Sequence, residues 1–545
     1  MAETFSTVTG DVANKAAHIV PSTVKMVNLT IEGRPVSVPD GTSILEAAKM
    51  AGVLIPHYCY HPGLPVAGVC RMCLVEVEKL PKLAPSCATI VGEGHVVHVH
   101  SPKALEARKG VLEFLLINHP LDCPICDQSG ECELQDYTFA EGRADSRYRE
   151  PKRFNPVEDF GGDVLYVQNR CILCTRCVRF MGDIAHDPVL NVSERGDRAY
   201  IGKAEGHDLT NPWAGNVVDL CPVGALLSKD FLNKARAWEL DRAPSVCTGC
   251  SQGCNIVVET RDNVVVRMRP RSNDAVNQFY MCEVGRAGYR EFNRRDRAEQ
   301  PMVRNGHALA IADWEDAIAA ASRLLDGKRV VVFASPNLSN EALFLLERLV
   351  ALSNGEGVFR VEMGSEFVLP GAPDLALRAE RGANATGARL LGFVQLSSSR
   401  LPLQEGDALL VVGEQLDGID GADLDRASAI VHVGTTLPDV LAARVHVLLP
   451  MANIPEEEGT LTNLRGRVQR FMQAKAAPGV ARPSWYVLAD LLAAMGGEGR
   501  YLAPEDVFDA MSATHAPFAT LDYDSLGLRG LPILAQSPVT AEAGA

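Results

Sequence analysis

The sequence predicts a multidomain protein that combines α/β and α+β domains, and three observations support this. The chain has 545 residues, which is enough for several domains of ordinary size. All fifteen cysteines lie between Cys59 and Cys282. From about residue 301 the pattern changes to apolar strands alternating with amphipathic helices, which is typical of a parallel sheet covered by helices. We therefore expect small cysteine-bearing domains first and a larger α/β domain after them.

The first expected domain has the element order of a small ferredoxin. Residues 26–55 predict two alternating strands joined by a turn and followed by a helix. Thr42 or Ser43 can cap the N-terminus of that helix, and Glu46 lies in its first turn. A cysteine loop follows, and residues 96–100 supply one more strand. This order favours a β-grasp ferredoxin.

Further elements follow in two groups. Residues 102–118 carry apolar side chains at helical spacing, so a helix is expected to deliver His119 to the loop that begins at Cys123. The later α/β region is expected to be parallel and doubly wound, with helices over 314–325 and 341–352 and strands over 329–334, 407–412 and 428–433.

The fifteen cysteines and one histidine sort into four groups of four that look like cluster ligand sets. Pairs of the form Cys-x2-Cys place two sulfurs within reach of one centre, and more distant residues complete each set. His119 completes the second group, because its three cysteines lack a fourth sulfur and no cysteine is left over. The sets are Cys59, Cys70, Cys73 and Cys87; His119, Cys123, Cys126 and Cys132; Cys171, Cys174, Cys177 and Cys221; and Cys247, Cys250, Cys254 and Cys282. This grouping indicates four iron–sulfur clusters.

Zinc is the main alternative to clusters at these sites. Structural zinc also uses four-cysteine and three-cysteine-plus-histidine sets, so spacing alone does not exclude it for any single group. Compact triplets that each have one outlying residue favour clusters, because zinc sites usually pair two short Cys-x2-4-Cys turns. The odd number of cysteines and the Cys-x2-Cys pairs count against a disulfide framework.

Composition and charge argue against several classes of function. A net charge of −15 argues against nucleic-acid binding, which needs a clustered basic face. The first 25 residues have no continuous apolar core, so we expect a loose tail rather than a secretory signal. No apolar run of about 18 residues occurs, so membrane contact is expected only through partners. No Gly-rich dinucleotide motif, Ser-His-Asp pattern or carboxylate pair emerges, so we expect no catalytic residue and no NADH site in this chain.

Three cysteine-rich strings resemble a known family. They are PHYCYHPGLPVAGVCRMC (56–73), CPICDQSGECELQD (123–136) and RCILCTRCVRF (170–180). These strings resemble the large, G-type iron–sulfur subunit of NADH:quinone oxidoreductase, respiratory complex I, and the resemblance is strong up to about residue 300. It implies one 2Fe-2S cluster on the Cys59 set and a 4Fe-4S cluster on each of the other three sets. One of these would have an imidazole ligand from His119.

Details around the third and fourth sets refine this expectation. Arg170, Arg176 and Arg179 flank the third set, where we expect ion pairs that could also offset cluster charge. The fourth set resembles the cluster domain that opens molybdopterin oxidoreductases, but Val284 stands where relatives with working molybdenum carry a lysine. Residues 454–471 resemble a molybdopterin-family loop. The chain has no cysteine after Cys282 to bind molybdenum, which leaves only a Ser or Asp ligand as an alternative. We therefore expect a truncated molybdopterin-oxidoreductase-like region without pterin.

The resemblance also implies how the chain is organised. The expected segments are a flexible tail (1–25), a 2Fe-2S ferredoxin domain (26–101), a His/Cys-ligated 4Fe-4S domain (102–145), a ferredoxin-like 4Fe-4S domain (146–240), a molybdopterin-type 4Fe-4S domain (241–300) and a molybdopterin-oxidoreductase-like α/β domain (301–545).

The function that the resemblance implies is electron relay. Electrons would enter the Cys59 centre from a flavoprotein partner that oxidises NADH, cross the Cys171 centre, and leave through the His119 centre toward quinone, bypassing the Cys247 cluster. Expected partners are that flavoprotein, a small 2Fe-2S subunit and the hydrophilic subunits of the quinone module, at the cytoplasmic side of a bacterial inner membrane. The alternatives are a molybdenum- or tungsten-dependent formate dehydrogenase large subunit, the small diaphorase subunit of an NAD-linked hydrogenase, and a zinc-stabilised assembly scaffold.

Overall fold

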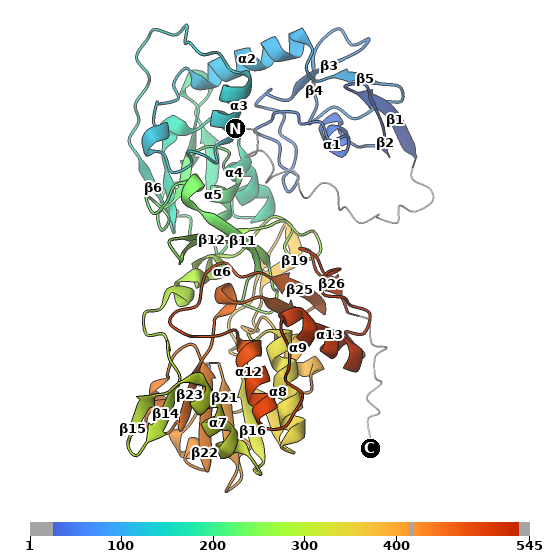
Figure 1. Cartoon of the computed structure of the whole chain (residues 1–545). Coiled ribbons are helices and arrows are strands. Elements are labelled where there is room, and N and C mark those ends of the chain that lie inside the picture. The colour runs from blue at the N-terminus through green and yellow to red at the C-terminus, as the bar shows by residue number, and fades with distance from the viewer. Residues whose placement is uncertain (1–24, 414–415, 417–418, 534–545) are drawn as a thin grey trace, which may run out of the picture. The chain divides into compact units, whose positions relative to one another are not determined.

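The computed structural model describes residues 25–413, 416 and 419–533. The chain divides into two compact units, one that ends at Trp238 and one that begins at Glu239 (Figure 1). The tail expected over residues 1–25 lies outside the described residues, apart from Lys25. Within the described ranges no helix is both long and apolar enough to cross a membrane.

The first unit opens with a five-stranded sheet in the order β2-β1-β5-β3-β4. Its strands are β1 (Met26–Ile31), β2 (Arg34–Pro39), β3 (Leu74–Val77), β4 (Ala84–Pro85) and β5 (Val96–His98). β1 and β2 form the expected antiparallel hairpin, whereas β1 and β5 run parallel. Helix α1 (Ile44–Met50) buries four residues in the core of this sheet, and the Ser43 side chain caps it by accepting a hydrogen bond of 3.2 Å from Glu46 N. The ferredoxin-like order predicted from the sequence is therefore present.

Two helices follow and pack through a buried charge. Helix α2 (Pro102–Leu116) ends three residues before His119, and α3 (Glu133–Glu141) begins directly after Cys132. Arg108 of α2 is fully buried, pairs with Glu141 of α3, and donates a hydrogen bond of 2.8 Å to Val99 O. This contact ties the second cysteine loop to the end of the first sheet.

The rest of the first unit surrounds the third cysteine group. A three-stranded sheet has the order β10-β7-β6, and β8 and β9 form a separate hairpin. The strands are β6 (Glu158–Gly161), β7 (Val164–Tyr166), β8 (Leu190–Ser193), β9 (Tyr200–Lys203) and β10 (Leu226–Ser228), and the helices are α4 (Arg176–Arg179) and α5 (Asn216–Leu220). A π-helical turn continues α4 over Phe180–Ile184.

The second unit opens with the antiparallel sheet β11-β12-β13. Its strands are β11 (Asp241–Val246), β12 (Asn255–Arg261) and β13 (Val264–Pro270), and the short helix α6 (Glu283–Ala287) follows Cys282. The buried carboxylate of Glu259 on β12 pairs with Arg242 of β11 and Arg267 of β13. One carboxylate therefore links all three strands.

An eight-stranded sheet forms the centre of the second unit, in the order β15-β14-β23-β22-β21-β16-β17-β20. Its strands are β14 (Met302–Asn305), β15 (Ala308–Ile311), β16 (Val330–Ala334), β17 (Glu356–Phe359), β20 (Val394–Gln395), β21 (Ala408–Val412), β22 (Ala429–Gly434) and β23 (Val447–Pro450). Six strands of this sheet are parallel, namely β16, β17, β20, β21, β22 and β23. Their spatial order is the 3-2-1-4-5-6 order of doubly wound folds. The antiparallel pair β14 and β15 at one edge was not predicted.

Helices cover both faces of this sheet, as the sequence predicts. Along β16, Val330 and Val332 join the core beneath α7, α8 and α12, whereas Val331 and Phe333 join a separate core on the other face. Figure 1 shows α7, α8 and α12 grouped beside the sheet. The helices are α7 (Trp314–Leu325), α8 (Asn340–Leu352), α9 (Ala385–Leu390), α10 (Gly421–Leu424), α11 (Asp439–Ala442), α12 (Ser484–Ala494) and α13 (Pro504–Thr514), and the remaining strands are β18 (Phe367–Leu369), β19 (Ala372–Leu377), β24 (Gly459–Thr462), β25 (Arg467–Phe471) and β26 (Leu531–Pro532).

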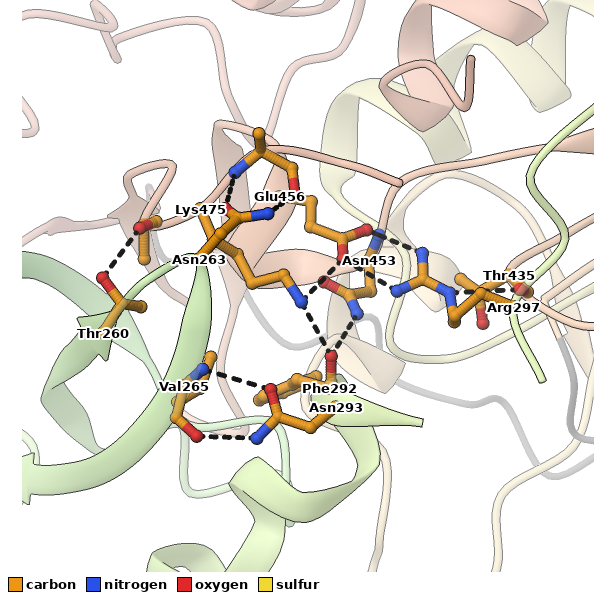
Figure 2. Close-up of polar contacts among 12 residues, drawn as sticks. Thr260, Asn263, Val265, Phe292, Asn293, Arg297, Thr435, Asn453, Glu456 and Lys475 are labelled. Atoms are coloured by element: carbon orange, nitrogen blue, oxygen red, sulfur yellow. Dashed lines mark hydrogen bonds and ion pairs between the residues drawn. The ribbon is translucent and has the colours of Figure 1, made fainter. Parts of the chain in front are cut away.

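Polar contacts tie the antiparallel sheet to the segment that follows β25 (Figure 2). Asn263, in the turn between β12 and β13, exchanges two hydrogen bonds with the backbone of Ala476, at 3.2 and 2.7 Å. Lys475 donates to Phe292 O at 3.1 Å and pairs with the buried Glu456 at 3.2 Å. Arg297 also pairs with Glu456, at 2.7 Å. The antiparallel sheet and the α/β part of this unit are therefore joined by buried charge.

Candidate metal centres

The first cysteine set is brought together at one edge of the five-stranded sheet. Cys59 N donates to Cys70 Sγ at 3.4 Å, and the Cys87 thiol lies within hydrogen-bonding reach of the thiols of Cys59 and Cys73. Gly68 in the preceding loop has a φ of +65°, a conformation that favours glycine because it has no Cβ. The structure therefore assembles the four predicted residues into one group.

The second set comprises His119 and three cysteines, Cys123, Cys126 and Cys132, whose thiols lie close enough to interact electrostatically. Cys126 and Cys132 are buried, Cys123 is exposed, and burial together with the charges of the other two thiols raises the pKa of Cys132 to about 12. His119 Nδ1 is buried and has no hydrogen-bond partner among the described residues. Burial, with Lys152 and Arg170 nearby, lowers the pKa of His119 to about 4, so the ring is neutral at pH 7. A buried, neutral and unpartnered ring nitrogen is what an imidazole ligand requires.

All four cysteines of the third set line one cavity. Tyr166, Ile172, Ile201 and Leu226 supply apolar walls to the same cavity. Left-handed backbone at Leu173 and Thr175 folds the loop tightly, and Leu173 N donates to Cys171 Sγ at 3.4 Å. Burial raises the pKa of Cys171 and of Cys221 to about 11 and that of Cys174 to about 12. Four thiolates in such a pocket would repel one another, so the donor set fits a positively charged iron–sulfur core.

The fourth set is wholly buried in the second unit. Cys247 N donates to Cys254 O at 2.8 Å, and Gly285 N donates to Cys282 Sγ at 3.4 Å. A Cβ at Gly285 would lie 2.9 Å from Cys247 Sγ, so this glycine lets the two parts of the set approach each other. Burial, with the charges of Cys282 and Cys250, raises the pKa of Cys247. These four cysteines therefore also form one group.

The segment over 454–471, which resembles a molybdopterin-family loop, contacts the cysteine loop of the fourth set. Leu464 N donates to Ser251 O at 2.8 Å, and the Gln469 side chain donates to Gly253 O at 2.9 Å. Asn463 donates to Gln252 O at 3.3 Å. The segment therefore holds the backbone between Cys250 and Cys254 in place.

The second and third sets are neighbours in the first unit. Glu133 N, which follows Cys132, donates to Pro222 O at 3.1 Å, and a Cβ at Gly224 would overlap Cys126 Sγ. Gly224 was not among the residues predicted to matter, because its position in the sequence gives no sign that Cys126 lies beside it. In the part of the chain that the structure describes, no three His, Cys, Asp or Glu side chains are arranged to hold a single metal ion.

Five family models match the chain in the order of these sites. They are a 2Fe-2S iron-sulfur cluster binding domain (24–102), the NADH-ubiquinone oxidoreductase-G iron-sulfur binding region (108–147), the NADH-quinone oxidoreductase subunit 3 ferredoxin-like domain (161–227), the molybdopterin oxidoreductase Fe4S4 domain (240–294) and molybdopterin oxidoreductase (379–494). These matches confirm the predicted fold class, and they show that 2Fe-2S and 4Fe-4S domains are both present.

Curated relatives carry names from one enzyme complex. The G-type subunit of NADH-quinone oxidoreductase from Rickettsia bellii is 41% identical over 59% of this chain and 48% of its own length. The mitochondrial NADH-ubiquinone oxidoreductase 78 kDa subunit of Candida albicans is 39% identical over 71% of this chain and 52% of its own. Iron-sulfur protein 1 of the mitochondrial NADH dehydrogenase of Solanum tuberosum is 37% identical over 73% of this chain and 52% of its own.

The chain spans about half the length of the curated relatives that it matches. A solved chain from an NAD+-reducing [NiFe]-hydrogenase in the H2-reduced state shares 30% identity over 38% of this chain and 90% of its own, with a TM-score of 0.36, at which no common fold is established. Over the residues that the curated alignments cover, this chain is a homologue of the large iron–sulfur subunit of NADH:quinone oxidoreductase, which confirms the resemblance predicted from its cysteine strings.

Proposed function

We propose that this chain relays single electrons within an NADH:quinone oxidoreductase, from an NADH-oxidising flavoprotein partner toward quinone. The observation that carries the proposal is the gathering of fifteen cysteines into four groups, each within a matched iron–sulfur domain. A bound cluster supplies a site that gains and loses one electron. The residues of this chain supply the ligands, the spacing and the exclusion of water.

The proposed ligands are the sixteen residues predicted from the sequence. The Cys59 set would hold one 2Fe-2S cluster, and the sets that begin at His119, Cys171 and Cys247 would each hold a 4Fe-4S cluster. Support comes from the mutual contacts in the first set, the shared cavity of the third and the glycine-mediated approach in the fourth. The unpartnered Nδ1 supports His119 as the histidine ligand. We place the domain boundaries at 101, 145, 240 and 300.

The path of electrons is also part of the proposal. Electrons would enter at the Cys59 set, pass to the Cys171 set and leave from the His119 set, while the Cys247 set lies off the path. The proposed partners are the flavoprotein, a small 2Fe-2S subunit and the hydrophilic subunits of the quinone module, and the proposed location is the cytoplasmic face of a bacterial inner membrane. The contacts between the Cys171 loop and its two neighbours support this order.

We propose further that the molybdopterin-oxidoreductase-like region binds no pterin. In doubly wound folds an anionic group sits at the N-terminus of the helix after the first strand, which here is α8 after β16. The buried carboxylate of Glu341 occupies the first turn of α8 and accepts hydrogen bonds from Thr460 N at 2.9 Å and Thr460 Oγ1 at 2.7 Å. A phosphate placed there would meet this carboxylate. Bound pterin would therefore contradict this proposal and favour the formate dehydrogenase alternative.

Replacement of Cys171 by Ala tests the relay in the assembled complex. We expect NADH to reduce the flavin at the wild-type rate while electron transfer to quinone is lost, because the third centre lacks a ligand. Lys229→Gln, which removes a half-buried cation paired with Asp159, is the matched control. Assembly is checked by subunit content, since loss of a metal site can also unfold its domain. Normal quinone reduction by an assembled Cys171→Ala complex would refute the relay.

A further inference from the structure

Three arginines in the string RCILCTRCVRF reach out of the third cysteine loop to the loops of the neighbouring sets. Arg170 precedes Cys171, Arg176 precedes Cys177, and Arg179 follows Cys177 by two residues. Each side chain bonds to at least one group outside its own loop, and together they contact the first and the second sets.

Arg179 joins the third set to the first. Its guanidinium donates to Cys59 O at 2.5 Å and to Cys174 O at 3.2 Å, so one planar cation bonds the main chain of a proposed ligand in each set. It also donates to Pro65 O at 2.5 Å, within the loop between Cys59 and Cys70. The rigid fork of arginine suits this bridging, whereas the ammonium of lysine is a compact point charge.

Arg170 joins the third set to the second. Its side chain is buried and forms two contacts with the carboxylate of Asp122, at 2.9 and 2.8 Å. Asp122 directly precedes Cys123, and Arg170 directly precedes Cys171. This ion pair therefore fixes the starts of the two cysteine loops relative to each other.

Arg176 lies at the junction of all three loops and is itself buried. It donates to Tyr60 O at 2.9 Å, next to Cys59, and to Leu220 O at 3.2 Å, next to Cys221. It also pairs with Glu133, next to Cys132, at 3.2 Å. The guanidinium therefore gives these three loops one shared hydrogen-bonding centre, although its Nε is buried without a hydrogen-bond partner among the described residues.

We propose that Arg170, Arg176 and Arg179 are positioning residues that hold the first, third and second centres at fixed separations, and that Arg179 and Arg170 each also set the potentials of the two centres that they join. The proposal rests on the function proposed above. In each transfer one electron leaves one centre and arrives at the next, and no bond or proton changes. A fixed cation in a poorly hydrated site stabilises an added electron nearby, so Arg179 raises the potentials of the first and third centres. Arg170 acts likewise on the third and second centres.

The test is an EPR-monitored redox titration of the whole complex carrying Arg179→Gln, Arg170→Gln or the control Lys229→Gln. In Arg179→Gln we expect the first and third potentials to fall by about 59 mV, a tenfold change in a one-electron equilibrium, while the second stays unchanged. In Arg170→Gln we expect the second and third to fall and the first to stay. Lys229→Gln should leave all three potentials at wild-type values.

Arg179→Lys keeps the positive charge but removes the planar guanidinium that bridges the two loops. We expect wild-type potentials in this variant, because the charge remains, but slower transfer from the first to the third centre, because the ammonium cannot reproduce the bridge. Unchanged potentials in Arg179→Gln would overturn the proposal. Loss of the third signal in both Arg179 variants would overturn it as well, since the residue would then be needed for folding alone. If the wild-type complex showed no cluster signals at all, the proposed function would fail instead.

Discussion

Gly224 lies so close to Cys126 Sγ that any Cβ at this position would overlap the sulfur. Gly224 belongs to the Cys221-Pro222 loop of the third set, whereas Cys126 belongs to the second set. The absence of one side chain therefore allows two proposed cluster sites to pack together in the first unit.

Replacement of Gly224 by Ala is expected to impair the second centre. The added methyl must displace Cys126 Sγ, so we expect the EPR signal of the second centre to be lost or to fall several-fold. Gly182→Ala is the matched control, because a Cβ at Gly182 meets no atom within 4 Å. Both variants are measured after dithionite reduction. A second-centre signal of full intensity in Gly224→Ala would contradict the ligand role of Cys126.

Replacement of His119 by Cys is expected to keep a cluster but lower its potential. A thiolate adds a negative charge where the neutral imidazole had none, and histidine ligation raises potentials in Rieske centres. The measurement is a redox titration of the second centre by EPR. His98→Cys, at an exposed imidazole that contacts Glu78, serves as the control for an added thiol. If the His119→Cys potential equals that of wild type, His119 is not a ligand.

The buried Glu457 should make the second unit less stable as pH rises. Burial, with the charges of Glu341 and Glu456, raises its pKa from 4.5 to about 8, although it accepts hydrogen bonds from Ser484 N at 2.6 Å and Ser484 Oγ at 3.0 Å. Between these two pKa values the folded chain holds a proton that the unfolded chain releases, so the free energy of unfolding falls as pH increases through this window.

Glu457→Gln should therefore weaken the pH dependence of Tm between about pH 5 and pH 8, since an amide does not titrate. Thermal unfolding of the second unit at several pH values provides the measurement. Some slope should remain, because burial also raises the pKa of Glu341 to about 7. Glu405→Gln, at an exposed carboxylate, should keep the wild-type slope. Identical slopes in wild type and Glu457→Gln would show that Glu457 does not hold a proton in the folded state.

The ion pair between Arg297 and Glu456 should contribute strongly to the stability of the second unit. Both side chains are almost fully buried and lie 2.7 Å apart (Figure 2). Arg297→Leu would leave Glu456 with Lys475 as its remaining cation, and breaking a buried pair costs about 3–5 kcal/mol. Arg444→Leu, which breaks a more exposed pair with Asp425, should cost far less, because solvent screens that pair. Equal losses in urea unfolding would contradict this assignment.

Local patterns in the sequence predicted much of the fold. Ser43 caps α1, the helix over 314–325 matches α7, and the strands predicted near 330, 408 and 429 are present as parallel neighbours. These elements follow from short-range periodicity and capping chemistry, which a single sequence displays. The edge strands β14 and β15 were missed because their side chains are mostly exposed or half-buried and carry no continuous apolar run.

The grouping of the site residues was predictable, but the relation between groups was not. Cys-x2-Cys spacing is local, so each set could be proposed from residue counting. Cys59 O and Arg179 are far apart in sequence, and only the folded chain brings them together. Gly224 was missed for the same reason, because the sulfur that excludes its side chain comes from another loop.

The measurement that tests the central claim most directly is iron, acid-labile sulfide, zinc and molybdenum content of anaerobically purified protein, combined with low-temperature EPR. One 2Fe-2S and three 4Fe-4S centres require about fourteen iron atoms with matching sulfide. We expect that total, with EPR signals from reduced clusters and neither zinc nor molybdenum. Zinc without sulfide would contradict the account and favour a structural scaffold, and molybdenum or tungsten with pterin would favour a formate dehydrogenase.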